Sequence, residues 1–105
     1  MSMKQMSVEE LKPRMDAGET IHLIDVREDH ERADFNIGGL HYKLGLITAM
    51  QFDDIEHLKD EEVIIYCRSG NRSQIAGLVM QSAGFTNVIN LAGGMLDWEA
   101  RFGRK

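Results

Sequence analysis

The chain has 105 residues, of which 43% are hydrophobic and 28% are charged, and its formal net charge is −5. This composition predicts one globular domain over 1–105, with a folded core at about 7–102 and little room for a second module. The acidic balance argues against nucleic acid or a membrane surface as a partner, and no apolar run approaches the roughly 20 residues that span a bilayer.

The cysteine and histidine content narrows the possible chemistry. A single cysteine, Cys67, excludes an internal disulfide and any multi-cysteine metal site. The four histidines are scattered, and their spacing suggests neither a metal site nor a Cys–His pair. The first residues lack the apolar segment of a secretory signal, so we expect a cytoplasmic protein with a reduced thiol.

The first half of the chain predicts alternating helices and strands. Ser7 and Glu10 form a capping-box pattern that begins a helix; we expect Pro13 to kink or restart this helix and Gly18 to end it. The apolar run at 21–26 is typical of a buried parallel strand. The next segments predict, in order, a short exposed helix at 29–35, a turn at 36–39, a short strand at 40–44 and a helix from 46 to about 57.

The second half continues this alternation. Residues 63–67 predict a strand, and 74–83 predict the clearest helix, whose apolar face carries Ile75, Leu78, Val79 and Ala83 and which Gly84 ends. The remaining segments predict a strand at 87–91, a turn at Gly93 and Gly94, and a helix at 95–102 with Trp98 and Phe102 inward. Such a pattern predicts an α/β fold with a central parallel sheet of about five strands and helices on both faces.

Cys67 is the strongest candidate for a reactive residue. It ends a predicted strand, as Asp25 does, and parallel sheets bind ligands at the carboxyl ends of their strands. The backbone amides from Arg68 to Ser73 and the positive end of the following helix are expected to lower the pKa of the thiol. We therefore predict a thiolate that is activated without a histidine base.

The loop after Cys67 offers groups for an anionic ligand. The guanidinium groups of Arg68 and Arg72 suit a sulfonate, phosphate or carboxylate. Ser69 and Ser73 add hydroxyl donors, although Ser73 is also a reasonable helix cap. Gly70, next to Asn71, is expected to adopt a backbone conformation that brings amides close to the sulfur.

The segment 25–28 is predicted to support this loop. Asp25 is expected to accept backbone amides of a neighbouring loop, and Arg27 and Glu28 to form an ion pair. Direct participation of Asp25 in catalysis is the less favoured interpretation.

Three segments together resemble the rhodanese family: Asp-Val-Arg-Glu at 25–28, Cys-Arg-Ser-Gly-Asn-Arg-Ser at 67–73 and Gly-Gly-Met-Leu-Asp-Trp at 93–98. The resemblance spans about 8–102, as in a stand-alone single-domain member. One stretch departs from the family: its usual Gly-His-Ile-Pro-Gly-Ala is replaced at 35–40, where only Ile37 and Gly39 match. The resemblance therefore implies the fold but not the shape of this loop or any partner that it contacts.

The resemblance implies a sulfurtransferase that works by double displacement. Cys67 would attack the outer sulfur of thiosulfate, release sulfite and hold the sulfur as a persulfide cradled by the loop amides. Arg68 and Arg72 would bind or orient the anionic donor. A second nucleophile (cyanide, a thiol or a protein acceptor) would then remove the sulfur, and no metal or organic cofactor is implied.

Other readings of the loop remain open. Phosphatases and arsenate reductases also use an amide-lined cysteine loop, but with five residues between cysteine and arginine, whereas four separate Cys67 from Arg72. The shorter loop favours a sulfur atom over a tetrahedral oxyanion. A third reading is a non-catalytic interaction module, in which we would expect the cysteine or the arginines to be lost. Among donors, the two arginines favour dianionic thiosulfate over 3-mercaptopyruvate, while a persulfide relay fits the loop equally well.

Overall fold

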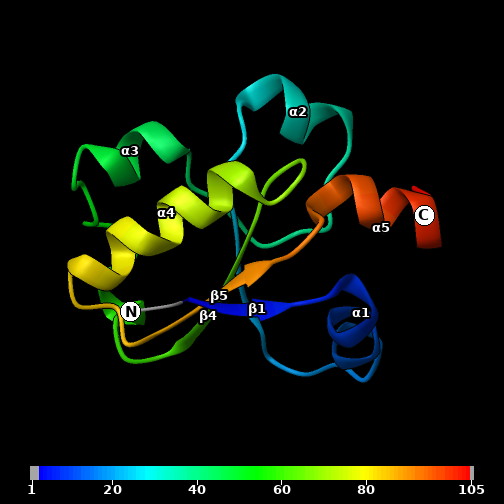
Figure 1. The fold of residues 1–105 in the computed structure, drawn as a ribbon, viewed down its shortest axis with the longest axis horizontal. Coiled ribbons are helices and arrows are strands. Elements are labelled where there is room, and N and C mark those ends of the chain that lie inside the picture. Colours follow the sequence, from blue (N-terminus) through cyan, green and yellow to red (C-terminus); the bar gives the residue numbers. More distant parts are fainter. Residues whose placement is uncertain (1–2, 105) are drawn as a thin grey trace.

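The computed structural model describes residues 3–104 and contains a single five-stranded parallel sheet in the order β1-β5-β4-β2-β3 (Figure 1). All four strand pairs are parallel. The strands are β1 (Lys4–Met6), β2 (His22–Asp25), β3 (Leu40–His41), β4 (Glu62–Tyr66) and β5 (Asn87–Leu91). The helices are α1 (Val8–Asp16), α2 (Asp29–Asp34), α3 (Leu44–Thr48), the 3₁₀ helix η1 (Glu56–Leu58), α4 (Asn71–Ser82) and α5 (Gly94–Phe102).

Side chains alternate between the two faces of the sheet, and each face has its own core. In β4, Val63 and Ile65 belong to the core beneath α3 and α4, whereas Ile64 and Tyr66 belong to the core beneath α1 and α5. All four are fully buried. This is the period of two expected of a strand that is covered on both sides, so the predicted α/β architecture is confirmed.

The sequence did not predict the edge strand β1. Lys4–Met6 pairs in parallel with β5, and the backbone of Met6 accepts a hydrogen bond from Ala92 at 2.8 Å. Only Met6 of these three residues is buried, so the segment carries no alternating apolar pattern that would have marked it as a strand.

The predicted helix from 46 to about 57 is wrong. α3 ends at Thr48, and Met50 adopts a left-handed backbone conformation with φ of 59°. A non-glycine residue in this region does not continue a helix. Ile47 and Ile55 are both buried, but the turn at Met50 separates them. Ile47 lies in α3, and Ile55 lies directly before η1. The predicted strand at 40–44 is likewise reduced to Leu40–His41.

The predicted apolar face of α4 is also wrong in part. Ile75 and Leu78 are 50% and 44% exposed, while Val79 and Ala83 do pack against the core. The helix begins at Asn71, three residues earlier than predicted, and turns a mostly small-residue face to the sheet: Ser73, Ala76, Gly77 and Met80. Small side chains allow α4 to lie close to the strands, and the resulting close packing stabilises the domain more than burial of Ile75 and Leu78 would.

The other helices follow their sequence signals. α1 has the predicted capping box at Ser7, but it runs through Pro13 to Asp16 as one helix, so the restart expected at Pro13 does not occur. In α5, Trp98 is buried and meets Phe102 edge to face at 5.0 Å between ring centroids. Across residues 3–104, no helix combines the length and the apolar character needed to cross a bilayer.

Candidate active site

Cys67 lies directly after β4, at the carboxyl edge of the sheet and at the start of the loop that leads into α4. Gly70 precedes α4 with φ of 101°, a left-handed conformation that a residue with a Cβ rarely adopts. This turn reverses the chain so that the first amides of α4 face back to the sulfur. The sequence predicted a Gly70 conformation that brings amides close to the sulfur, and the Gly70 amide itself lies 3.1 Å from Cys67 Sγ.

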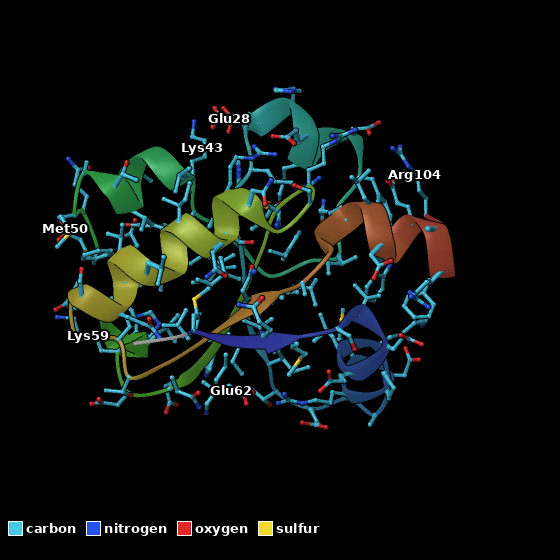
Figure 2. All side chains as sticks on the ribbon, viewed as in Figure 1. Glu28, Lys43, Met50, Lys59, Glu62 and Arg104 are labelled. Atoms are coloured by element: carbon cyan, nitrogen blue, oxygen red, sulfur yellow. The ribbon has the colours of Figure 1, made fainter. Side chains whose placement is uncertain are left out.

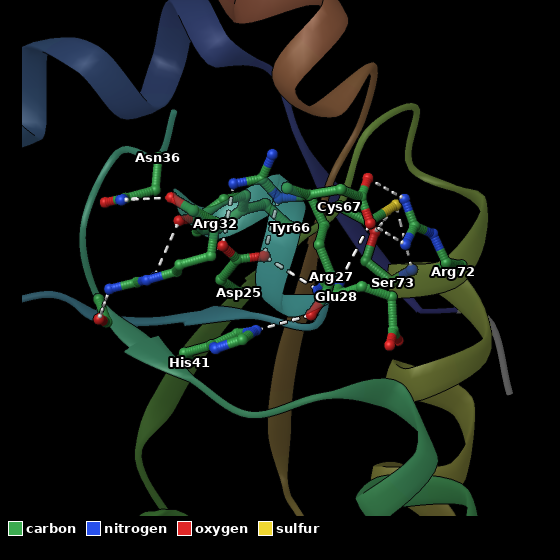
Figure 3. Close-up of polar contacts among 12 residues, drawn as sticks. Asp25, Arg27, Glu28, Arg32, Asn36, His41, Tyr66, Cys67, Arg72 and Ser73 are labelled. Carbon is green, nitrogen blue, oxygen red and sulfur yellow. Dashed lines mark hydrogen bonds and ion pairs between the residues drawn. The ribbon is translucent and has the colours of Figure 1, made fainter. Parts of the chain in front are cut away.

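Three hydrogen-bond donors lie within reach of Cys67 Sγ. The Gly70 amide donates at 3.1 Å, and the amide and hydroxyl of Ser73 each lie at 3.4 Å. Figure 3 shows Ser73 reaching towards the sulfur from α4. The donors come from the loop and the first turn of the helix, as the sequence suggested, but the loop contributes fewer amides than its full length would allow.

The environment of Cys67 favours the thiolate. Burial of the thiol opposes ionisation, but the hydroxyl of Ser73 and the amides of Ser73, Gly70 and Ser69 outweigh it, and the pKa of Cys67 is lowered. The donors stabilise the charged form specifically, because a thiolate accepts stronger hydrogen bonds than a thiol. The residue is fully buried and is the only cysteine of the chain.

A polar network behind Ser73 links the loop to the edge of the sheet. The Ser73 hydroxyl also makes a short hydrogen bond to Asn90 Oδ1, on β5. The Asn90 side-chain amide in turn donates to Gln5 Oε1 on β1 at 2.9 Å and to the Gly70 carbonyl at 3.3 Å. Asn90 is 4% exposed. Neither Asn90 nor Gln5 was among the predicted site residues, although an asparagine inside an apolar strand is a usable signal for a buried polar network.

The start of α5 holds the other side of the loop. The Met95 and Leu96 amides each donate at 2.9 Å to the carbonyls of Cys67 and Arg68. A Cβ on Gly94 would lie 2.4 Å from the Cys67 carbonyl oxygen, so only glycine permits this approach. The Gly93–Gly94 turn, predicted as a simple chain reversal, therefore also positions the cysteine.

The two loop arginines differ in their surroundings. Arg68 is exposed, and within residues 3–104 its guanidinium has no ion pair. Arg72 forms a bidentate pair with Glu31 of α2, with Nη1 to Oε1 at 2.6 Å and Nη2 to Oε2 at 2.7 Å. This pair lowers the pKa of Glu31 to about 2 and raises the pKa of Arg72. The sequence had treated Arg72 as available to an anionic donor and had not selected Glu31.

Asp25 bonds within its own segment and not to the neighbouring loop as predicted, and Arg27 has a different partner from the one expected. The fully buried Asp25 accepts the backbone amide of Arg27 at 3.0 Å and its side chain at 2.9 and 3.0 Å. The predicted pair between Arg27 and Glu28 is wrong, because burial of Asp25 demands a cation and Arg27 folds back to provide it. Arg32 lies 3.5 Å from the same carboxylate (Figure 3).

The remaining residues of the predicted site lie at its rim. Ser69 is exposed, and Asn71 is the exposed first residue of α4. The Ser69 amide contributes to the lowered pKa of Cys67, but it is not one of the three hydrogen bonds to Sγ described above. Within the described residues, no group of three or more His, Cys, Asp or Glu side chains is arranged to hold a metal ion.

The model of the Rhodanese-like domain family matches residues 7–101. The chain belongs to this family. YtwF of Bacillus subtilis is 40% identical to this rhodanese-like domain, over 94% of the chain and 93% of the relative, and a sulfurtransferase of Allochromatium vinosum is 36% identical, over 94% and 90%. The chain also matches YrkF of Bacillus subtilis at 35% identity but spans only 53% of its length.

Solved structures agree with the fold of this rhodanese-like domain. A rhodanese-like domain protein from Staphylococcus aureus superimposes with a TM-score of 0.78 at 26% identity, covering 91% of each chain. The human single-domain sulfurtransferase TSTD1 superimposes with a TM-score of 0.77 at 24% identity, covering 95% of this chain and 98% of its own. The family and its named members support sulfurtransferase function.

Proposed function

We propose that the protein transfers a sulfane sulfur from thiosulfate, or from a related persulfide donor, to a thiophilic acceptor through a persulfide on Cys67. The observation that carries this proposal is the environment of Cys67 Sγ, which receives the Gly70 amide at 3.1 Å and the Ser73 amide and hydroxyl at 3.4 Å. These donors favour a thiolate nucleophile and remain in place to stabilise a terminal sulfur anion bonded to it.

In the first step, the Cys67 thiolate attacks the outer sulfur of thiosulfate. A bond forms between Sγ and that sulfur, the bond to the sulfonate sulfur breaks, and sulfite leaves with the electron pair. Thiolate plus thiosulfate dianion gives a persulfide anion plus sulfite dianion, so charge and electrons balance. No separate base is needed, because the attacking group is already ionised.

In the second step, a thiophilic acceptor attacks the terminal sulfur of the persulfide. The acceptor is cyanide in an assay and a thiol or a protein thiolate in a cytoplasmic setting. The bond between the two sulfur atoms breaks, and Cys67 leaves as the thiolate that began the cycle. The cycle balances without a metal or an organic cofactor.

Mass spectrometry of the intact protein tests this proposal. Treatment with thiosulfate should add one sulfur (~32 Da) to the chain, and later addition of a thiol should remove it, as covalent catalysis requires. The variant Cys67→Ala should show neither change and should not transfer sulfur to cyanide. Turnover near wild type in Cys67→Ala would exclude the proposed nucleophile.

A further inference from the structure

Four arginines surround the candidate site, and three of them are already engaged. Arg27 is held by Asp25 and by the Phe35 carbonyl, the latter at 2.7 Å. Arg32 donates to the Gly38 and Gly39 carbonyls at 3.1 and 2.8 Å, and Arg72 is paired with Glu31. Within residues 3–104, Arg68 alone of the four has no ion pair or side-chain hydrogen bond.

The pair between Arg72 and Glu31 is built into the fold. The Glu31 carboxylate also accepts the backbone amide of Glu28 at 3.0 Å and so forms the capping box of α2. The two side chains are only 32% and 16% exposed. Both oxygens of Glu31 meet both terminal nitrogens of Arg72, which is the arrangement that an external carboxylate or sulfonate would otherwise adopt.

Arg72 also lies close to the reactive sulfur. The hydrogen bonds that it donates to Glu31 are the main cause of its raised pKa, and the charge of Cys67 adds to it. Figure 3 shows Arg72 beside Cys67. Glu31 thus places a fixed negative charge on the guanidinium group whose pKa also responds to the charge of Cys67. A dianion that approaches here has to displace this carboxylate or bind beside it, and both are unfavourable.

We infer that Glu31 is a specificity-determining residue, which turns the site away from dianionic thiosulfate and towards organic persulfides of low charge. The inference rests on the proposed sulfurtransferase function and names its donor class. Because the Glu31 carboxylate neutralises the guanidinium group of Arg72, Arg68 is the only cationic side chain of the loop that remains to attract a free anion.

The corresponding step is a thiol–persulfide exchange. The Cys67 thiolate attacks the outer sulfur of R–S–SH, a bond forms between Sγ and that sulfur, and the bond within the donor breaks. R–S⁻ leaves with the electron pair, and the proton stays on the transferred sulfur, so atoms and charge balance. The leaving thiolate carries one charge fewer than sulfite, so its departure past Glu31 is less strongly opposed.

The test compares Glu31→Gln with the matched control Glu62→Gln. Gln is a natural capping-box residue, so the first variant keeps the cap of α2 and loses only the charge. The second variant also loses a carboxylate paired with an arginine, since Glu62 Oε1 lies 2.6 Å from Arg14 Nη2. Figure 2 shows Glu62 at the opposite edge of the molecule from α2.

The rate of sulfur addition to Cys67 is measured by intact mass with two donors, thiosulfate and cysteine persulfide. In Glu31→Gln the ratio of the thiosulfate rate to the persulfide rate should rise by about threefold to tenfold, as expected for removal of one part-buried charge next to a dianion. In Glu62→Gln the ratio should equal that of wild type. Sulfate, an inert dianion, should inhibit the persulfide reaction more strongly in Glu31→Gln than in wild type.

Three results would overturn the inference. An unchanged ratio, or an equal loss with both donors, would mean that Glu31 only holds Arg72 in place. The same conclusion would follow if sulfate inhibited both proteins equally, a measurement that does not depend on the rate with thiosulfate. If instead no donor added sulfur to the wild-type protein, the proposed function itself would fail, and the inference with it.

Discussion

Replacing Ser73 by alanine removes a hydroxyl that serves two partners at once. Its oxygen lies 3.4 Å from Cys67 Sγ and forms a short hydrogen bond with Asn90 Oδ1. A hydroxyl has one hydrogen, so it donates to only one of them at a time. We expect donation to Sγ when Cys67 is ionised and donation to Asn90 when it is not. Ser73→Ala therefore affects both the reactivity of the thiol and the stability of the domain.

The structure sets the size of both effects. A hydrogen bond to a charged group contributes about 1.5–3 kcal/mol, and the long distance to Sγ places this one at the lower limit, which is about a tenfold change in the ratio of thiolate to thiol. The buried Asn90 oxygen loses its donor in the same variant. An unpaired buried acceptor costs about 1–3 kcal/mol of unfolding free energy.

Alkylation by iodoacetamide measures the thiolate directly, because the chain has a single cysteine. At a pH below the thiol pKa, the rate for Ser73→Ala should fall about tenfold, and denaturant unfolding should show the loss of stability. Ser82→Ala is the control, since its hydroxyl bonds to Val79 at the far end of the same helix. An unchanged rate together with reduced stability would refute the reasoning, because the amides alone would then stabilise the thiolate.

Three further predictions concern the surroundings of the site. Gly94→Ala should destabilise the fold and change the alkylation rate of Cys67, because the new Cβ would lie 2.4 Å from the Cys67 carbonyl oxygen. The control Gly84→Ala, also at positive φ but with no atom within 4 Å of the new Cβ, should show only the cost of the backbone conformation. Equal effects of the two variants on Cys67 would disprove a positioning role for α5. The difference in unfolding free energy between wild type and Glu31→Gln should be constant above about pH 5 and shrink as the pH falls towards 2, because the pKa of Glu31 is about 2 in the folded state and about 4.3 in the unfolded state. Urea titrations across this pH range measure the difference. A difference that grows on acidification would contradict the prediction. Met80→Ala should cost about 2–5 kcal/mol of unfolding free energy, whereas Leu78→Ala should change it by about 0.5 kcal/mol or less, and comparable losses would contradict the observed face of α4.

The errors in the prediction of α3 and α4 have a common cause. Periodicity reports which residues are apolar but not which apolar residues find a partner. Ile75 and Leu78 satisfy the helical spacing but remain 50% and 44% exposed, while Gly77 and Ala76 on another face are buried. The helix predicted beyond Thr48 is wrong for a similar reason, since no local signal in the sequence indicates the left-handed turn at Met50.

The sequence by itself determined the α/β architecture, the position of Cys67 at the end of a strand and the need for a glycine conformation at Gly70 that brings amides close to the sulfur. These features depend on local properties: apolar runs, glycine at a sharp turn, and a cysteine directly before a helix. The resemblance of three short segments to a known family was also readable without coordinates, and the family match over residues 7–101 agrees with it.

Only the tertiary structure decided which side chains act on the site. Glu31 is 41 positions from Arg72, and Asn90 is 17 positions from Ser73. The chain has 17 acidic residues, and nothing in their order shows which one reaches the loop arginine. The choice is geometric: parallel packing of the strands brings β5 beneath the loop and sets α2 beside it, so partners distant in sequence determine the charge around Cys67.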